Sequence, residues 1–135
     1  MDRRTLALIC CIVAVTGCGG VQRESLEGVV TLDGQPLQNG YITFQPQSDT
    51  RGPTAGAQID SGKFAIPASK GTFAGHFRVE IISTRLSGRT IADRDGTLVP
   101  AKEQFLPKKY NVQSNLEVQV NPNELNQFTF ELTLR

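Results

Sequence analysis

The sequence predicts an all-β domain, a seven-stranded antiparallel β-sandwich, and three observations support this prediction. Short runs rich in β-branched and aromatic residues recur along the chain, and most of them alternate polar and apolar residues. Gly, Pro, Asn and Asp residues typical of turns separate these runs. No window carries an apolar stripe of helical period and helical length. Many short strands at close spacing are typical of a sandwich.

Seven runs fit a strand, and most of them end at a turn residue. In chain order they are 25–32 before Asp33-Gly34, 41–45 before Pro46, 54–59 before Asp60-Ser61-Gly62, 63–66 before Pro67, 76–82, 115–120 before Asn121-Pro122, and 128–134. Asp-Gly is a strong hairpin signal, and Pro cannot donate to a central ladder. The run 54–59 is the weakest of the seven, because its residues have low strand propensity.

Alternation within the runs predicts which side chains form the core. Successive side chains of a strand point to opposite faces, so every second residue shares a face. Ile42 and Phe44 are therefore expected to be opposite Tyr41 and Thr43. The other side chains expected on the apolar face are Leu116, Val118, Val120, Phe128, Phe130, Leu132 and Leu134.

Residues 83–104 do not show the alternation of polar and apolar residues that is typical of strands. They contain Arg85, Arg89, Arg94 and Lys102, three acidic residues and few apolar ones. We expect a long loop here, and a loop of this length is usually functional or mobile. Its two interpretations are a mobile surface loop and a ligand-binding loop that uses Arg85, Arg89 and Arg94.

The first 18 residues have the layout of a signal peptide. Arg3-Arg4 precede an apolar run of about ten residues, too short for the roughly 20 that cross a bilayer as a helix. Val15, Thr16 and Gly17 then lead to Cys18, and these four residues resemble the lipobox of bacterial lipoproteins. The resemblance implies cleavage before Cys18 and lipidation of its thiol. The expected organisation is a signal peptide over 1–17, a lipidated Cys18 with a tether over 18–24, and a domain over 25–135.

Composition excludes several classes of function for the domain. The chain has three cysteines, at positions 10, 11 and 18, so the domain that follows has no thiol for a disulfide or a metal site. The 14 Lys and Arg residues nearly balance 13 Asp and Glu residues, which argues against a nucleic-acid partner. There is no Trp to stack on a sugar ring.

Several motifs between Gly28 and Val79 resemble a known family. Gly28-Val29-Val30, Asp33-Gly34-Gln35-Pro36-Leu37 and residues 40–44, followed by 60–64 and 75–79, resemble transthyretin-like, or carboxypeptidase regulatory-like, domains. With the lipobox before it and Phe105-Leu106-Pro107-Lys108-Lys109-Tyr110-Asn111 after it, the chain resembles a group of short bacterial lipoproteins that carry this domain. The resemblance implies a sandwich used as an accessory, adhesive or structural module.

No catalytic set can be assembled from the sequence. His76 is the single histidine, and both triad chemistry and zinc binding require partners at defined spacing. Asp93-Arg94-Asp95-Gly96 has the look of a calcium loop, but position twelve is Gln104 instead of Glu, so a plain turn is expected. We predict no enzyme activity, no cofactor and no metal site.

These observations predict a lipid-anchored protein of the cell envelope, exported to the outer membrane, the periplasmic face or the cell surface. Its expected role is that of a non-catalytic structural or protein-interaction module. The alternative is a glycan- or peptide-binding module that uses residues 83–104. The expected partners are the membrane, through the Cys18 lipid, and an envelope protein or a glycan.

Overall fold

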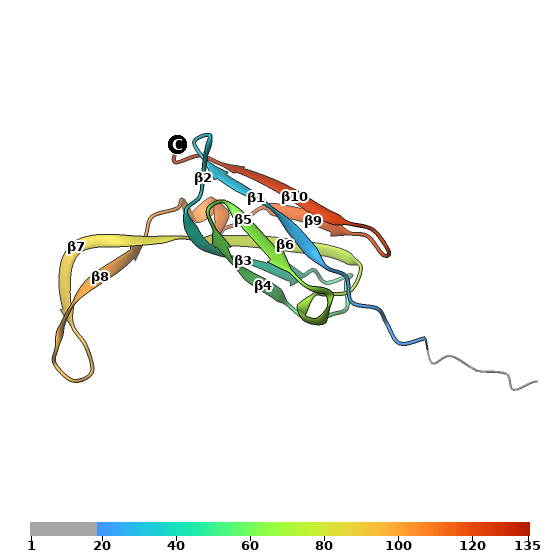
Figure 1. The fold of residues 1–135 in the computed structure, drawn as a ribbon, viewed down its shortest axis with the longest axis horizontal. Helices are drawn as coiled ribbons and strands as arrows, with labels where there is room; N and C mark the ends of the chain where they lie inside the picture. Colours follow the sequence, from blue (N-terminus) through green and yellow to red (C-terminus); the bar gives the residue numbers. More distant parts are fainter. Residues whose placement is uncertain (1–18) are drawn as a thin grey trace, which may run out of the picture.

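The computed structural model describes residues 19–135, which form an all-β fold (Figure 1). The expected signal peptide, its lipobox residues and Cys18 lie outside the described residues. The strands are β1 (Leu26–Leu32), β2 (Gln35–Pro36), β3 (Asn39–Pro46), β4 (Ala55–Asp60), β5 (Lys63–Ile66), β6 (Gly75–Ile82), β7 (Thr84–Ala92), β8 (Leu98–Gln104), β9 (Leu116–Val120) and β10 (Asn126–Leu132). Two 3₁₀ turns, Ala68–Lys70 and Lys108–Tyr110, lie between strands. All seven expected strands are present.

One curled sheet forms the body of the molecule. Its strand order is β10-β1-β5-β4-β3-β6-β9, with the short β2 paired to β1. β4 and β5 share a single residue pair, Asp60 with Lys63, so the sheet bends sharply at this hairpin. The turn between them needs left-handed backbone at Ser61 and Gly62, with φ of 51° and 79°. The bend lets the two parts of the sheet enclose apolar side chains.

One strand pair departs from the expected antiparallel arrangement. β1 and β10 run parallel from Leu26 beside Asn126 to Leu32 beside Leu132. Parallel neighbours need a long crossover connection, and here almost the whole domain supplies it. The other pairs in the sheet are antiparallel.

The core lies inside the curl and matches the alternation of the sequence. Ile42 and Phe44 are fully buried, and Phe130 and Leu132 are nearly so. The rings of Phe44, Phe64, Phe128 and Phe130 form a cluster with centroid separations between 5.8 and 6.4 Å. Separations in this range favour tilted ring pairs.

Leu134 is the exception to the expected core and is 48% exposed. The strand ends at Leu132. Beyond it, the N–H of Thr133 donates to the hydroxyl of Tyr110, and the N–H of Leu134 lies 3.4 Å from a carboxylate oxygen of Asp33. These contacts replace the ladder and carry the Leu134 side chain away from the core.

Residues 83–104 are not the unstructured loop that the sequence suggests. They form a hairpin of β7 and β8, which protrudes from one end of the body (Figure 1). Its turn is closed by the Gly96 N–H, which donates to Asp93, and the Asp93 carboxylate accepts the Asp95 N–H. Residues 93–96 therefore form a turn, as the sequence suggests. A register shift between Leu86 and Thr90 interrupts the ladder, and Gly88 there has φ of 79°.

The N-terminal part of the fold begins one residue earlier than expected. The Glu24 N–H donates to the Thr72 carbonyl at 2.7 Å, and the buried Glu24 carboxylate accepts the Asn123 N–H at 3.3 Å. Residues 19–23 are exposed and leave the body at the end away from the hairpin (Figure 1). Within residues 19–135, no helix is long and apolar enough to cross a membrane.

Candidate functional site

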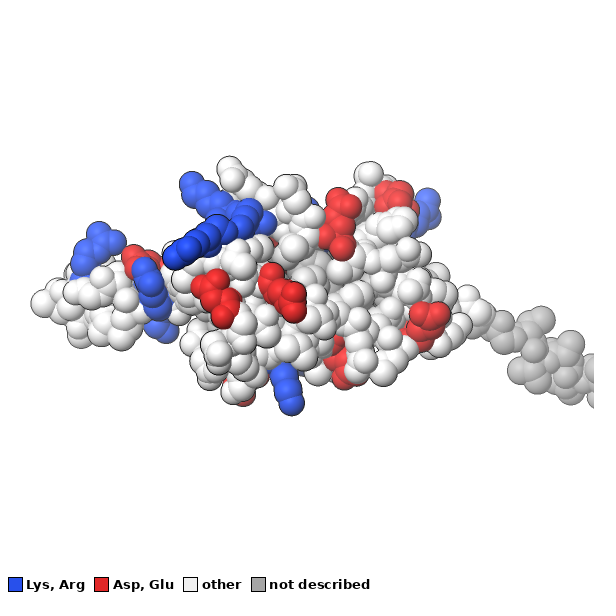
Figure 2. Space-filling model, turned by 90° about the horizontal axis from the view of Figure 1, so that it is seen from above, with Lys and Arg blue, Asp and Glu red and all other residues white. Residues whose placement is uncertain are grey.

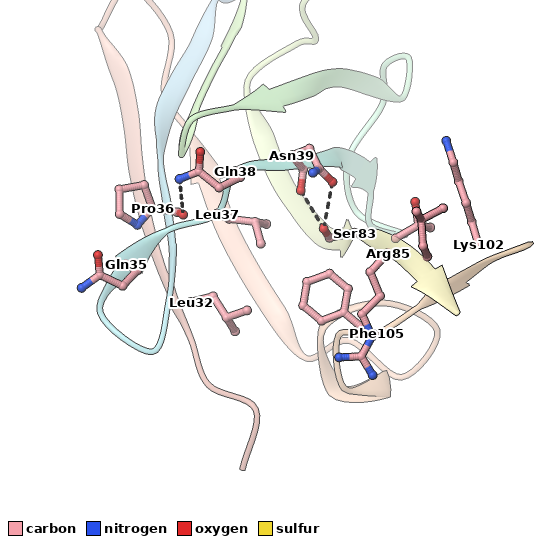
Figure 3. A pocket seen from close by; sticks show the side chains of 12 residues that line it. Leu32, Gln35, Pro36, Leu37, Gln38, Asn39, Ser83, Arg85, Lys102 and Phe105 are labelled. Atoms are coloured by element: carbon pink, nitrogen blue, oxygen red, sulfur yellow. Dashed lines mark hydrogen bonds between the residues drawn. The ribbon is translucent and has the colours of Figure 1, made fainter. Parts of the chain in front are cut away.

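A hollow of about 560 Å³ lies where the hairpin leaves the body (Figure 3). Leu32 and residues 35–39 line one side, residues 83–86 line the other, and Lys102 and Phe105 complete it. We call this hollow the hairpin groove. It combines an apolar floor, charged side chains and a backbone edge.

Ser83 joins the hairpin to the body. It separates β6 from β7 and is 2% exposed, and its hydroxyl donates to the Asn39 carbonyl at 2.7 Å. The side-chain oxygen of Gln104 accepts the N–H groups of Ser83 at 3.0 Å and of Leu106 at 3.2 Å. Both strands of the hairpin are therefore held at their base, and the two sides of the groove have a defined separation.

The floor of the groove is apolar. Leu37 is buried, whereas Leu32 and Phe105 are half-buried and pack against the main core. Their three side chains converge on the hollow (Figure 3). A preformed, partly buried apolar surface favours the binding of an apolar group of a ligand, because burying that group removes more apolar area from water.

Two cations line the groove, and one of them, Arg85, forms an ion pair with Glu103. The Arg85 guanidinium lies 5.4 Å from the centre of the Phe105 ring, and its Nε donates to Glu103 at 3.1 Å. Lys102 is on the neighbouring strand, with its ammonium directed away from the apolar floor (Figure 3). The lining contains these two cations and no acidic side chain. The groove can therefore bind an anionic group close to an apolar one.

The structure does not bring the three candidate arginines together. Arg85 lines the groove, but Arg89 lies within the register shift of β7 and Arg94 lies in the turn of the hairpin. Both of the latter are exposed. Sequence patterns do not single out Leu32, Leu37 and Phe105 as site residues, because they come from separate parts of the chain. The apolar Phe105-Leu106 pair directly after the charged segment was the one available signal.

His76 lies on the surface, away from the groove. Its Nδ1 donates to the Asp49 carboxylate at 2.8 Å, and both side chains are more than half exposed. This hydrogen bond holds the pKa of the Asp49 carboxyl below its ordinary value. Within residues 19–135, no three His, Cys, Asp or Glu side chains are grouped to hold a metal ion. The His76–Asp49 hydrogen bond connects the 47–50 turn to β6. The backbone N–H of His76 also donates to the Thr50 hydroxyl, which strengthens this connection.

Comparisons with known proteins do not assign a family. No protein-family model matches the chain, and no curated protein matches its sequence. Among solved structures, a 9R-lipoxygenase from Cyanothece is similar over 98% of this chain at 14% identity, with a TM-score of 0.42. The chain spans 18% of the length of that lipoxygenase.

Proposed function

We propose that this chain is a lipid-anchored protein of the cell envelope whose domain is a non-catalytic structural or protein-interaction module. The observation that carries the proposal is the β7–β8 hairpin, which protrudes at the end of the body away from residues 19–23 (Figure 1). An anchor at Cys18 would place a membrane at the tether end. The hairpin would then point toward other components of the envelope.

The lipobox supports the anchor. Val15, Thr16 and Gly17 precede Cys18, and the described residues 19–23 are exposed and free of strand structure. A diacylglyceryl group supplies two acyl chains, and two chains are enough for stable anchoring where one is marginal. Delivery to the outer membrane, the periplasmic face or the cell surface follows from the same proposal.

The curled sheet supports a transthyretin-like sandwich as the fold of this module. The bend at Asp60-Lys63 separates β10-β1-β5 from β4-β3-β6-β9, and the apolar cluster fills the space between these two groups. Sandwiches are built in this way, from two sheet faces around one core. Asp33-Gly34 and Ser61-Gly62 lie in turns, and Asp60 is the last residue of β4.

The exposure of the hairpin supports an interaction role. Leu86, Ile91 and Leu98 are 63%, 54% and 71% exposed on a sheet of only two strands. An isolated two-stranded hairpin is marginally stable in water. A partner that covers these side chains would stabilise the hairpin and remove apolar surface from water.

In-cell photo-crosslinking tests the proposal. A photoreactive amino acid at Ile91 of the hairpin is compared with the same amino acid at Thr129, which is exposed on β10. We expect a distinct protein adduct from position 91 and not from position 129, identified by mass spectrometry. Equal labelling at both positions, or turnover of a substrate by the purified protein, would contradict an interaction module.

The hairpin groove favours one alternative, a glycan- or peptide-binding module. Its volume and its mix of apolar and polar lining suit a small ligand. If this alternative holds, Arg85→Ala abolishes binding of the ligand and leaves the free energy of unfolding nearly unchanged, because Arg85 is exposed.

A further inference from the structure

The edge of β7 lies open at the hairpin groove. β3 pairs with β6 as far as Tyr41 beside Ile82, and its first residue is Asn39. Before Asn39 the chain turns away through β2, so β3 does not continue alongside β7. The groove occupies the position that the next residues of such a strand would fill.

The hydrogen-bond pattern shows which backbone groups face this opening. The Ser83 carbonyl accepts the Phe105 N–H at 3.2 Å, so the backbone groups of Ser83 point to the β8 side. Backbone groups of successive residues in a strand point to alternate sides. Those of Thr84 and Leu86 therefore point away from β8, toward the groove. Among the described strands, β7 pairs with β8 alone.

We propose that an extended, acidic segment of a partner protein binds here as a third strand of the hairpin. This inference rests on the proposed interaction role and names the site and the chemistry of the partner. The segment exchanges main-chain hydrogen bonds with Thr84 and Leu86. It runs antiparallel to β7, in line with β3. Strand addition of this kind gains affinity from the main chain and specificity from pockets for alternate side chains.

The apolar floor selects one side chain of the segment. Leu32, Leu37 and Phe105 converge beside the open edge (Figure 3). A residue of the segment that pairs close to Thr84 can direct an aliphatic side chain into this space. Its neighbours on either side then point to the opposite face, because side chains alternate along a strand.

The excess of basic residues near the groove favours a partner segment that is acidic. Residues 84–110 contain six Lys and Arg residues and three Asp and Glu residues, whereas the rest of the described chain contains six and nine. Lys and Arg side chains gather over the hairpin and the adjoining end of the body (Figure 2). A basic segment would meet repulsion there, and an acidic one is attracted at long range.

Other sheet edges fit this partner less well. β8 contains Pro100, which lacks an N–H and makes the free edge of this strand poor for extension. β10 is flanked on its exposed face by Glu131 and by Glu27 of the adjacent β1, which would repel an acidic segment.

A peptide probe tests the inference on the full-length chain purified in detergent. The probe is an eight-residue peptide of alternating Glu and Val, and the matched controls replace Glu by Lys or carry N-methyl groups along one edge of the backbone. We expect the acidic peptide to bind and to slow hydrogen exchange at the Thr84 and Leu86 amides, and neither control to do so. Binding that is absent, that is equal for the Lys peptide, or that leaves both amides unprotected overturns the proposal.

Two variants at one position give an independent test. Thr84→Pro removes the N–H that faces the groove, and Thr84→Val keeps it. Thr84→Pro is expected to weaken binding of the acidic peptide about tenfold, because one main-chain hydrogen bond is lost and the proline ring clashes with the bound strand. Thr84→Val should bind as the parent does, and equal affinity of both variants contradicts strand addition. The N-methylated peptide keeps the test valid if Thr84→Pro does not fold.

Photo-crosslinking separates this inference from the proposed function. A photoreactive amino acid at Leu86, which borders the groove, is compared with one at Ile91. An adduct from both positions supports strand addition at the groove. An adduct from position 91 alone keeps the interaction role and overturns the groove as its site, and no adduct from either position overturns both.

Discussion

The hydroxyl of Ser83 donates a 2.7 Å hydrogen bond to the carbonyl of Asn39, across 44 positions of sequence. This bond ties the first residue of β3 to the junction of β6 and β7. Ser83 lies between the end of β6 in the body and the start of β7 in the hairpin. The direction of the hairpin therefore depends on this buried side chain as well as on Gln104 at the end of β8.

Ser83→Ala is expected to destabilise the protein by about 1–2 kcal/mol, because it removes the bond and leaves the Asn39 carbonyl short of a partner. Denaturant unfolding measures this change, and hydrogen exchange of the hairpin amides should also become faster. Ser87→Ala is the matched control. The Ser87 hydroxyl donates to Ala101 at 3.2 Å within the hairpin, so its loss should leave the hairpin base unchanged. Equal effects of both variants would show that the junction has no special role.

Gly28 allows the close approach of β1 and β10. A Cβ at this position would lie 2.1 Å from the Phe128 carbonyl oxygen and 2.9 Å from the Phe64 ring. Gly28→Ala must therefore push the two parallel strands apart, and we expect a loss of about 1–3 kcal/mol or more, as for other overpacked sites. Thermal unfolding followed by circular dichroism measures the loss. Gly20→Ala, which meets nothing within 4 Å, should be neutral.

The Asp49 carboxyl offers a test of the surface pair with His76. The hydrogen bond from His76 is the largest cause of its lowered pKa, followed by hydrogen bonding from Thr50 among the lowering effects. A lowered pKa means that the carboxylate stabilises the fold at a pH above the ordinary pKa of 3.8 and that this contribution is lost as the pH falls below it. In His76→Ala, the pKa measured by NMR titration should rise toward 3.8. An unchanged pKa would contradict the pairing.

Local patterns predict the strands but not their long-range partners. The alternation at Phe128 and Phe130 indicates a buried face, and Asp33-Gly34 indicates a turn, because both signals act within a few residues. The parallel match of Val29 with Thr129 depends on packing across the whole chain, so no local pattern contains it. The hairpin was missed because β7 has few apolar residues and a register shift, which hide its period.

The groove was missed for a related reason. Its floor joins Leu32 and Leu37, near the start of the domain, to Phe105, which follows the hairpin. Each of these residues looks like an ordinary core residue in the sequence. Only the path of the chain at Ser83 brings them together beside an open strand edge.

The lipid anchor is tested by Cys18→Ala, for which we expect a protein that is uncleaved or released from the membrane, yet folded. Folding should persist because the hydrogen bonds of the described fold begin at Glu24. The change removes the thiol that would carry two acyl chains, and without them a domain of balanced charge has little affinity for a bilayer. Membrane fractionation measures release from the membrane, intact-mass measurement detects the uncleaved chain, and circular dichroism reports whether the domain is folded. Cys11→Ala is the matched control, since it removes a cysteine within the proposed signal peptide and keeps the proposed lipobox. Cys18→Ala processed and retained at the membrane like the parent protein would contradict the anchor, and the placement of the hairpin away from a membrane would lose its basis.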